Sequence, residues 1–126
     1  PGLPILAAAF FREEQQQLCL FAQKYPNVYV MGISEECNYP SMTYDVTRMR
    51  LDMLQFKFNA YTSHSNNVEQ VISRWTHARS MLARILQEKY NCAMYAGWNA
   101  TGEEISRDVR SVLGHGVLRF VQYVQE

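Results

Sequence analysis

The sequence predicts an α+β fold in which residues 1–126 form a single domain, with helices packed on a mostly antiparallel sheet. Three observations predict this class. Apolar residues recur with a helical period in residues 68–90, and they alternate with polar residues in residues 46–61. Residues 27–34 and the closing residues 117–124 are rich in the β-branched and aromatic side chains that strands favour.

The first predicted element is an amphipathic N-terminal helix over residues 4–25. Pro4 suits a first helical turn, and Pro26 cannot continue a helix. The apolar residues spaced by three, four or multiples of these are Leu6, Phe10, Leu18, Phe21, Ala22 and Tyr25. The segment NVYVMGIS, residues 27–34, then predicts a short strand, and residues 35–45 have the acidic, Asn, Pro and Ser residues of a loop.

Residues 46–63 predict a long strand. The apolar residues Met49, Leu51 and Met53 alternate with Arg48, Arg50 and Asp52. From Leu54 the phase changes, so an unbroken strand would carry its two apolar sets on opposite faces. Either a bulge near Met53 redirects the chain, or the two halves are covered on different sides, partly by another subunit. A helix over residues 43–54 is the alternative.

A long helix over about residues 67–90 is the most regular element of the pattern. Asn66 and Glu69 have the spacing of a capping box before it. The segment CAMYAGW then predicts a further strand, and NATGEEISRD a polar excursion. In the closing stretch, Gly114 and Gly116 predict a turn into a final strand that is apolar on both faces, as in a strand covered on both sides.

Composition excludes several classes of protein. Twelve Lys and Arg balance twelve Asp and Glu, so we expect no sequence-specific nucleic-acid binding. We expect no membrane span either, because no apolar run approaches the roughly 18 residues that one needs. Cys19, Cys37 and Cys92 are odd in number and widely spaced, which indicates free thiols.

The sequence offers little catalytic chemistry, and we expect no catalytic residue, no cofactor and no metal. His64, His77 and His115 have no metal-ligand spacing, and a site of Cys37, Cys92 and His115 has no support from spacing. No glycine-rich phosphate loop or nucleophile motif is present. One enzymatic alternative is a tautomerase-type reaction with Pro1 as the base, which would need a free amine in an apolar pocket.

The order of predicted elements resembles the tail-terminator and tail-completion proteins of long-tailed bacteriophages. The segments that carry the resemblance are YPNVYVMGIS, MRLDMLQFKFNAYTSHSNNVEQVISRW and the closing GHGVLRFVQYVQE, and together they extend over nearly the whole chain. Two segments depart from the pattern. TGEEISRDVRSVL also fits a helix, and the loop at 35–45 has no clear counterpart in the family pattern.

The resemblance implies a non-enzymatic structural virion protein of the tail or neck, assembled in the host cytoplasm. It would form a homo-oligomeric ring, a hexamer in the family, and bind the tail tube protein and the head completion or connector protein. DNA would pass through the lumen. The candidate subunit interface is Met49, Leu51, Met53, Phe120, Val121 and Tyr123. A soluble α+β interaction domain with another partner is the alternative.

Overall fold

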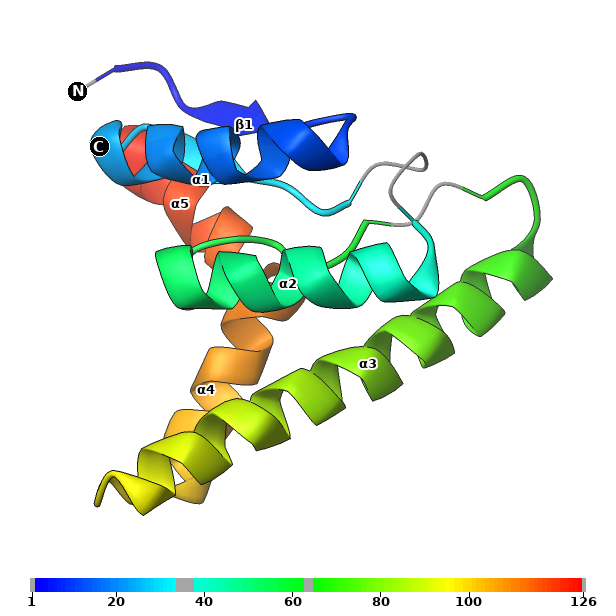
Figure 1. Ribbon diagram of the computed structural model, residues 1–126. Coiled ribbons are helices and arrows are strands. Elements are labelled where there is room, and N and C mark those ends of the chain that lie inside the picture. The colour runs from blue at the N-terminus through cyan, green and yellow to red at the C-terminus, as the bar shows by residue number, and fades with distance from the viewer. Residues whose placement is uncertain (1, 34–37, 63–64, 126) are drawn as a thin grey trace.

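The computed structural model describes residues 2–33, 38–62 and 65–125, and it corrects the predicted fold class (Figure 1). The chain is 67% helical, and the strands among the described residues are two short parallel ones. The prediction of a mostly antiparallel sheet is therefore wrong. The fold is dominated by helices that surround a small parallel sheet.

The sheet pairs β1 (Ile5–Ala7) with β2 (Val28–Val30) in parallel, with Ile5 opposite Val28 and Ala7 opposite Val30. Phe58 extends this arrangement through a parallel bridge to Val30. The Asn59 backbone N–H donates to the Val30 carbonyl at 2.9 Å. Three segments of the chain thus run side by side in one direction, in the order in which they occur in the sequence.

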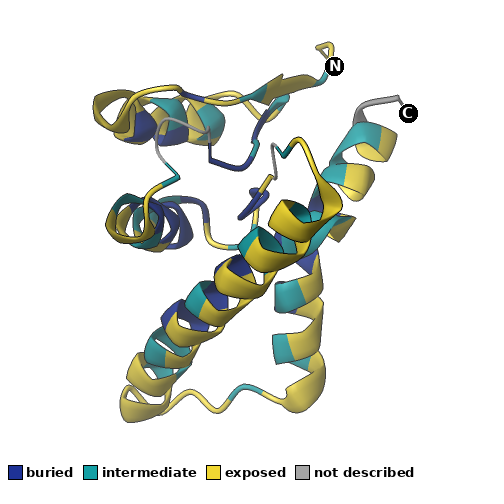
Figure 2. Cartoon of the chain, turned by 90° about the vertical axis from the view of Figure 1, so that its right-hand side faces the viewer, coloured by how far each residue is buried: buried dark blue, intermediate teal, exposed yellow. Residues whose placement is uncertain are grey.

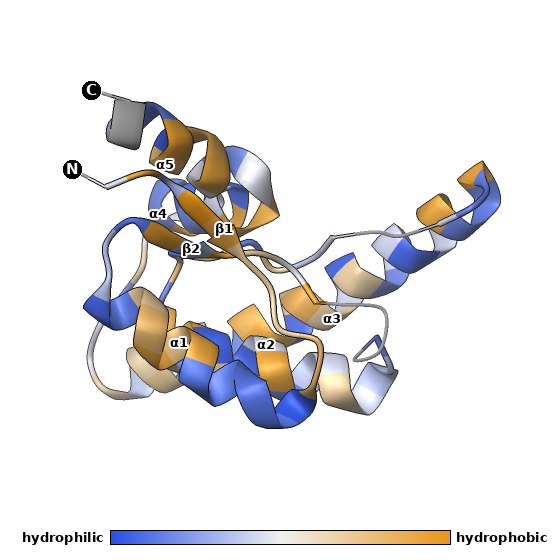
Figure 3. Cartoon of the chain, turned by 90° about the horizontal axis from the view of Figure 1, so that it is seen from above, coloured by the Kyte–Doolittle hydropathy of each residue, from blue (hydrophilic) through white to orange (hydrophobic). Residues whose placement is uncertain are grey.

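Helices connect the three segments because parallel neighbours need a crossover rather than a hairpin. A short 3-10 helix, η1 (Arg12–Glu14), leads into α1 (Gln15–Lys24), and β2 is followed by α2 (Pro40–Leu54). Helices α1 and α2 pack against each other, and Figure 3 shows both on the same side of the strands. This is the arrangement that two successive crossovers of the same hand produce.

The predicted long helix is confirmed as α3 (Val68–Tyr95). Its cap is Asn67, whose side chain accepts from the Gln70 N–H at 2.8 Å, so it lies one residue later than the predicted capping box. Figure 2 shows the dark, buried face of α3 turned inward and its yellow face exposed. The buried residues are Ala78, Leu82, Ile85 and Leu86.

From Gly102 to Gln125 the chain is helical except at a kink formed by Leu113 and Gly114. Helix α4 (Gly102–Arg110) begins with a capping box between Thr101 and Glu104, a kinked segment η3 (Ser111–His115) follows, and α5 (Gly116–Gln125) ends the described chain. Gly114 has a φ of 125°, which L side chains rarely adopt, and it allows the kink between α4 and α5. The predicted closing strand is wrong, whereas the helical alternative for TGEEISRDVRSVL is confirmed.

Three further differences concern the ends of elements. The predicted N-terminal helix begins only at residue 15, because residues 5–7 form β1. The predicted long strand is wrong over residues 46–54, where the helical alternative is confirmed as α2. The predicted strand at CAMYAGW consists of the last residues of α3 and the turn after it. No described helix is long and apolar enough to cross a membrane.

The main core lies between the strands and the helices. Its buried members come from α1, β2, α2, α3, η3 and the segment after α2, and they are Cys19, Val30, Leu51, Leu54, Phe58, Ala60, Leu82, Ile85, Leu86 and Val112. Tyr29 points to the opposite face of the sheet, since side chains alternate along a strand. There its ring lies 5.1 Å from the Phe120 ring of α5, between centroids. The sheet thus has cover on both faces.

Two isoleucines on α3 test this placement of the core. Ile85 is 1% exposed and Ile72 is 62% exposed. Ile85→Ala should lower the free energy of unfolding by about 2–5 kcal/mol, because it leaves a cavity in the core. Ile72→Ala should change it by less than about 0.5 kcal/mol. Urea unfolding followed by circular dichroism measures both, and equal effects would contradict the assigned face.

Candidate functional site

The candidate site is the carboxyl edge of the sheet, which we define as residues 8–11, 31–33 and 59–62. Each of these segments leaves a strand position and runs toward the next helix. In parallel α/β arrangements the carboxyl ends of the strands gather at one edge, and ligands bind just outside it. The neighbouring residues 34–37 and 63–64 lie outside the described chain.

A buried arginine from α2 ties this edge together. Arg50 is 0% exposed, and one guanidinium nitrogen donates to the Met31 carbonyl at 3.0 Å and to the Gly32 carbonyl at 2.8 Å. The second terminal nitrogen donates to Gln15 Oε1 at 2.6 Å. The Gln15 amide in turn donates to the Ala9 carbonyl at 3.2 Å. The planar guanidinium therefore joins the segment after β1 to the segment after β2.

A close backbone contact fixes the third segment of the edge. Gly32 is buried, and a Cβ atom placed on it would lie 2.4 Å from both the backbone nitrogen and Oγ1 of Thr62. No real Cβ atom tolerates that distance to a backbone atom, so any larger residue would force the two segments apart. Glycine at this position lets the chain after β2 pass directly beside the chain after Phe58.

Neutral polar side chains complete the carboxyl edge. Asn59 Oδ1 accepts from the Tyr61 N–H at 3.1 Å, which holds the turn after Phe58. The Tyr61 ring meets the Trp75 ring of α3 edge-on, with centroids 5.1 Å apart. Its hydroxyl accepts from Asn38 Nδ2 at 3.5 Å. The edge therefore holds amide and phenol groups, of the kind that can donate to and accept from hydroxyl groups, but Asn59 and Tyr61 are buried and Asn38 is half-buried.

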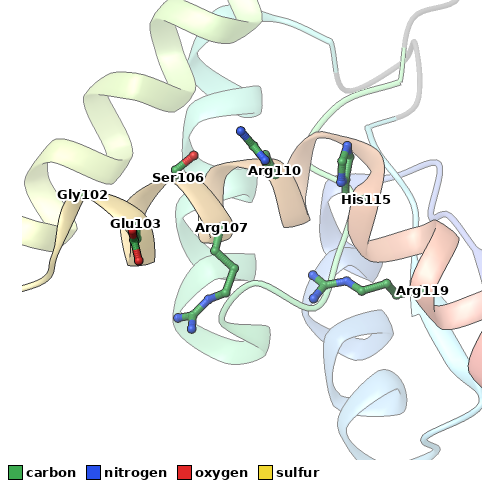
Figure 4. A pocket seen from close by; sticks show the side chains of 7 residues that line it. All are labelled: Gly102, Glu103, Ser106, Arg107, Arg110, His115 and Arg119. Carbon is green, nitrogen blue, oxygen red and sulfur yellow. The ribbon is translucent and has the colours of Figure 1, made fainter.

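A second candidate is a basic cleft of about 520 Å³ along α4, η3 and α5. Its lining is Gly102, Glu103, Ser106, Arg107, Arg110, His115 and Arg119. Arg107 pairs with Asp108 at 3.2 Å, and Arg119 donates to Ser111 Oγ at 3.2 Å. Figure 4 shows Arg110 and His115 extending to one side of the ribbon and Arg107 and Arg119 to the other. The cations do not converge on one point, so the carboxyl edge is the better-organised site.

A cavity of about 750 Å³ lies at the opposite, amino edge of the strands. Tyr29 lines it, and burial raises the pKa of the Tyr29 hydroxyl to about 12. This hydroxyl has no hydrogen-bond partner among the described residues. It lies against Gly116, where an added Cβ would approach it to 2.4 Å.

The structure brings together only part of the predicted subunit interface. Met53, Phe120 and Tyr123 line the amino-edge cavity. Leu51 is 4% exposed and belongs to the main core of the chain, and Met49 packs against that core. Val121 is half-buried on α5. The interface itself stays a prediction.

The structure describes only some of the residues that were predicted as free thiols or considered as metal ligands. Cys19 is buried in the main core, where burial raises the pKa of its thiol, and Cys92 is exposed on α3. Cys37, His64 and Pro1 lie outside the described residues. Within residues 2–33, 38–62 and 65–125, no three His, Cys, Asp or Glu side chains group as metal ligands would.

The sequence interpretation missed Gln15, Gly32, Arg50 and Tyr61. Arg50 carried a usable signal, because it falls within the helical stripe of α2 that is buried. Read with a period of 3.6, that stripe is Thr43, Val46, Thr47, Arg50, Leu51 and Leu54. An arginine inside such a stripe needs internal hydrogen-bond partners.

The chain is similar to a uronate isomerase. A solved structure of this enzyme from Bacillus halodurans C-125 superposes with a TM-score of 0.91 and has 35% sequence identity. The match covers 94% of this chain and 28% of the isomerase chain, so this chain spans little more than a quarter of that protein. No protein-family model matches the sequence, and no curated protein is significantly similar to it.

Two arginines on α2 test the network at the carboxyl edge. Arg50→Lys should lower the free energy of unfolding by about 1–3 kcal/mol, because an ammonium group cannot reach all three acceptors and leaves carbonyls buried without a donor. Arg48→Lys, on the exposed side of the same helix, is the matched control and should change it by less than about 0.5 kcal/mol. Urea unfolding distinguishes the two. A silent Arg50→Lys would show that the network does not hold the edge.

The buried hydroxyl of Tyr29 makes the fold sensitive to alkali. Its pKa rises from 10.0 to about 12 in the folded chain. Between these values the unfolded state loses its proton first, so stability present below pH 10 is lost as the pH rises toward 12. Tyr29→Phe should be at least as stable as the original chain at pH 7, because it removes a buried hydroxyl without a described partner. It should also lose less stability above pH 10.

Urea unfolding at a series of pH values measures this difference. Tyr123→Phe is the matched control, because the Tyr123 side chain is 75% exposed on α5. It should follow the original chain at every pH. Identical alkaline profiles for Tyr29→Phe and the original chain would contradict the burial of the hydroxyl.

Proposed function

We propose that this chain forms part of an enzyme that isomerises a uronate. The observation that carries the proposal is the match to the solved isomerase, in which 35% identity extends over 94% of this chain at a TM-score of 0.91. Because the chain covers 28% of that protein, the activity is proposed for an assembly of this chain with the remaining part of such an enzyme.

The contribution of this chain would be three adjacent strand ends of the active-site edge. A uronate is a sugar acid, so its site needs groups that bond hydroxyls and a group that binds a carboxylate. The Tyr61 hydroxyl and the amides of Asn38 and Asn59 are suited to the hydroxyls. They lie at the end of the strands where ligands bind in parallel α/β folds.

Arg50 would act as a positioning residue in this enzyme. Its guanidinium donates to the Met31 and Gly32 carbonyls and to Gln15, and it is fully buried. Its role would be to hold the segments after β1 and β2 at a fixed separation. Residues that contact a ligand need supporting residues behind them that keep them rigid. The carboxylate of the uronate would bind a cation at some other position of the complete enzyme.

The tail-terminator role stays a prediction that no comparison tests. The elements that suggested it were a long central strand and a closing strand, and the structure has α2 and α5 at those places. No feature of the described residues favours a ring-forming role over the isomerase proposal.

A chimera tests the proposal. This chain replaces the matched segment of the Bacillus halodurans isomerase, and the purified protein is assayed for conversion of a uronate. We expect a folded, active enzyme, because the two backbones superpose over almost the whole segment. A folded chimera without activity would contradict the proposal, and so would one that does not fold.

Tyr61 gives this experiment a matched pair of variants. In the chimera, Tyr61→Phe keeps the ring on Trp75 but removes the hydroxyl, and it should lower kcat/KM by about threefold to tenfold, the value of one hydrogen bond. Tyr95→Phe is the control, because Tyr95 is 93% exposed at the end of α3. Unchanged kinetics for Tyr61→Phe would remove Tyr61 from the site.

A further inference from the structure

The cavity at the amino edge of the strands has the size of a small-molecule site. Its volume of about 750 Å³ lies within the roughly 300–1,000 Å³ that such sites occupy. It lies where α1 and α2 end and α5 begins, and Figure 3 shows α5 on the side of the strands opposite α1 and α2. The carboxyl edge lies at the other end of the same strands, so this cavity is a separate site.

The charged groups of the cavity leave an excess of positive charge. Asp52, Lys57 and Arg119 line it, and Asp52 forms an ion pair with Lys89. Neither Lys57 nor Arg119 has a carboxylate within ion-pair distance among the described residues. Two cations therefore line one concave surface without a described counter-ion, and this composition suits a ligand that carries a negative charge.

A buried hydroxyl lies beside one of these cations. The Tyr29 hydroxyl has no hydrogen-bond partner among the described residues, although Tyr29 is only 5% exposed. A Cβ atom placed on Gly116 would lie 2.4 Å from this hydroxyl and 2.9 Å from Ser111 Oγ, so the two hydroxyls are neighbours. Ser111 Oγ accepts from the Arg119 guanidinium at 3.2 Å. Tyr29, Ser111 and Arg119 thus form one polar cluster in the wall of the cavity.

The Tyr29 hydroxyl has a proton to donate and no described group that accepts it. Ser111 Oγ is already engaged, because it accepts from Arg119 and donates to the Phe56 carbonyl at 2.9 Å. A carboxylate oxygen is a strong acceptor for such a donor, and it would pair with the Arg119 guanidinium at the same time. The Arg119 side chain is exposed and makes a single hydrogen bond among the described residues, so it can shift to admit a carboxylate.

Apolar side chains form another part of the cavity wall. Met53, Phe56 and Phe120 line it, and each is half-buried. The Phe120 ring packs on the Tyr29 ring with 5.1 Å between centroids, so aromatic surface lies close to the polar cluster. An inorganic anion gains nothing from such a wall, whereas an apolar group that lies against it leaves water. The lining therefore favours an organic acid over an inorganic anion.

We propose that the amino-edge cavity binds an organic acid that has one carboxylate and an apolar body. The carboxylate would accept from the Tyr29 hydroxyl and pair with Arg119. Lys57 would be the second cation, and the apolar body would lie against Met53 and Phe120. The bound acid would supply the acceptor that the Tyr29 hydroxyl lacks among the described residues. The inference is independent of the proposed isomerase activity, because that activity is assigned to the opposite edge of the strands.

Isothermal titration calorimetry of this chain with hydrocinnamate tests the proposal. The probe carries one carboxylate and one apolar ring, and we expect it to bind. Two comparison ligands separate its parts, because hydrocinnamyl alcohol keeps the ring without the charge and acetate keeps the charge without the ring. Each should bind at least about tenfold more weakly than hydrocinnamate. Absence of hydrocinnamate binding, or equally tight binding of acetate or inorganic phosphate, would overturn the proposal.

Three variants locate the bound probe. Tyr29→Phe should weaken hydrocinnamate binding by about threefold to tenfold, the value of one hydrogen bond, while the fold stays at least as stable. Arg119→Gln removes the paired charge and should weaken binding by at least about tenfold. Arg110→Gln is the matched control, because the exposed Arg110 lines the basic cleft and not this cavity. Equal losses for the two arginine variants would assign the acid to the basic cleft and overturn the proposal.

Nuclear Overhauser contacts supply a readout that does not depend on a variant. In the complex with this chain, the ring protons of hydrocinnamate should show contacts to the Met53 methyl group and to the Phe120 ring. Contacts to other side chains in place of these two would overturn the proposal. Tyr29→Phe that binds hydrocinnamate as tightly as the original chain does would also overturn it, because the buried hydroxyl would then have no part in binding.

Discussion

Parallel pairing of β1, β2 and the segment at Phe58 is the constraint on which the rest of the molecule depends. A parallel neighbour cannot be reached by a tight turn, so each connection must travel back along the sheet, and here each does so as a helix. That requirement places α1 and α2 on one face and gathers the segments that leave the strands at one end. Arg50 can join two of these segments only because α2 lies beside both.

Two periodicities coexist in the sequence of α2, and they explain the error in the predicted long strand. Residues 49–53 alternate apolar and polar side chains, but the buried residues of the helix recur at spacings of three and four from Thr43 to Leu54. The apparent change of phase at Leu54 is the end of this helix, where Gln55 takes a φ of 56°. A short window contains both patterns, and the tertiary contacts decide between them. The confirmed prediction, α3, rested on a helical period that persists from Val68 to Tyr90, and the helix continues to Tyr95.

The closing stretch was predicted to be a strand covered on both faces. It is a helix instead, and only part of its apolar surface is covered. In α5, Phe120 packs on Tyr29, whereas Leu118 is 64% exposed and Tyr123 is 75% exposed. The carboxyl edge was harder to predict, since it depends on contacts between segments far apart in the sequence. Gly32 looks like any loop glycine until Thr62 is seen against it. Arg50 looks like the polar half of an alternating strand until α2 is known to be helical.

The stability of such a small sheet has to come from elsewhere. Strands of three residues, paired at three positions, are below the size that is stable independently, so β1 and β2 persist because the helices bury them. That cover is complete around Val30 and Phe58, which are 0% exposed, and incomplete at Ile5 and Leu6, each 48% exposed. The gradient runs across the sheet from the edge closed by η3 to the edge at β1. The helices therefore stabilise the sheet unevenly, with full cover beside η3 and exposed apolar side chains at β1.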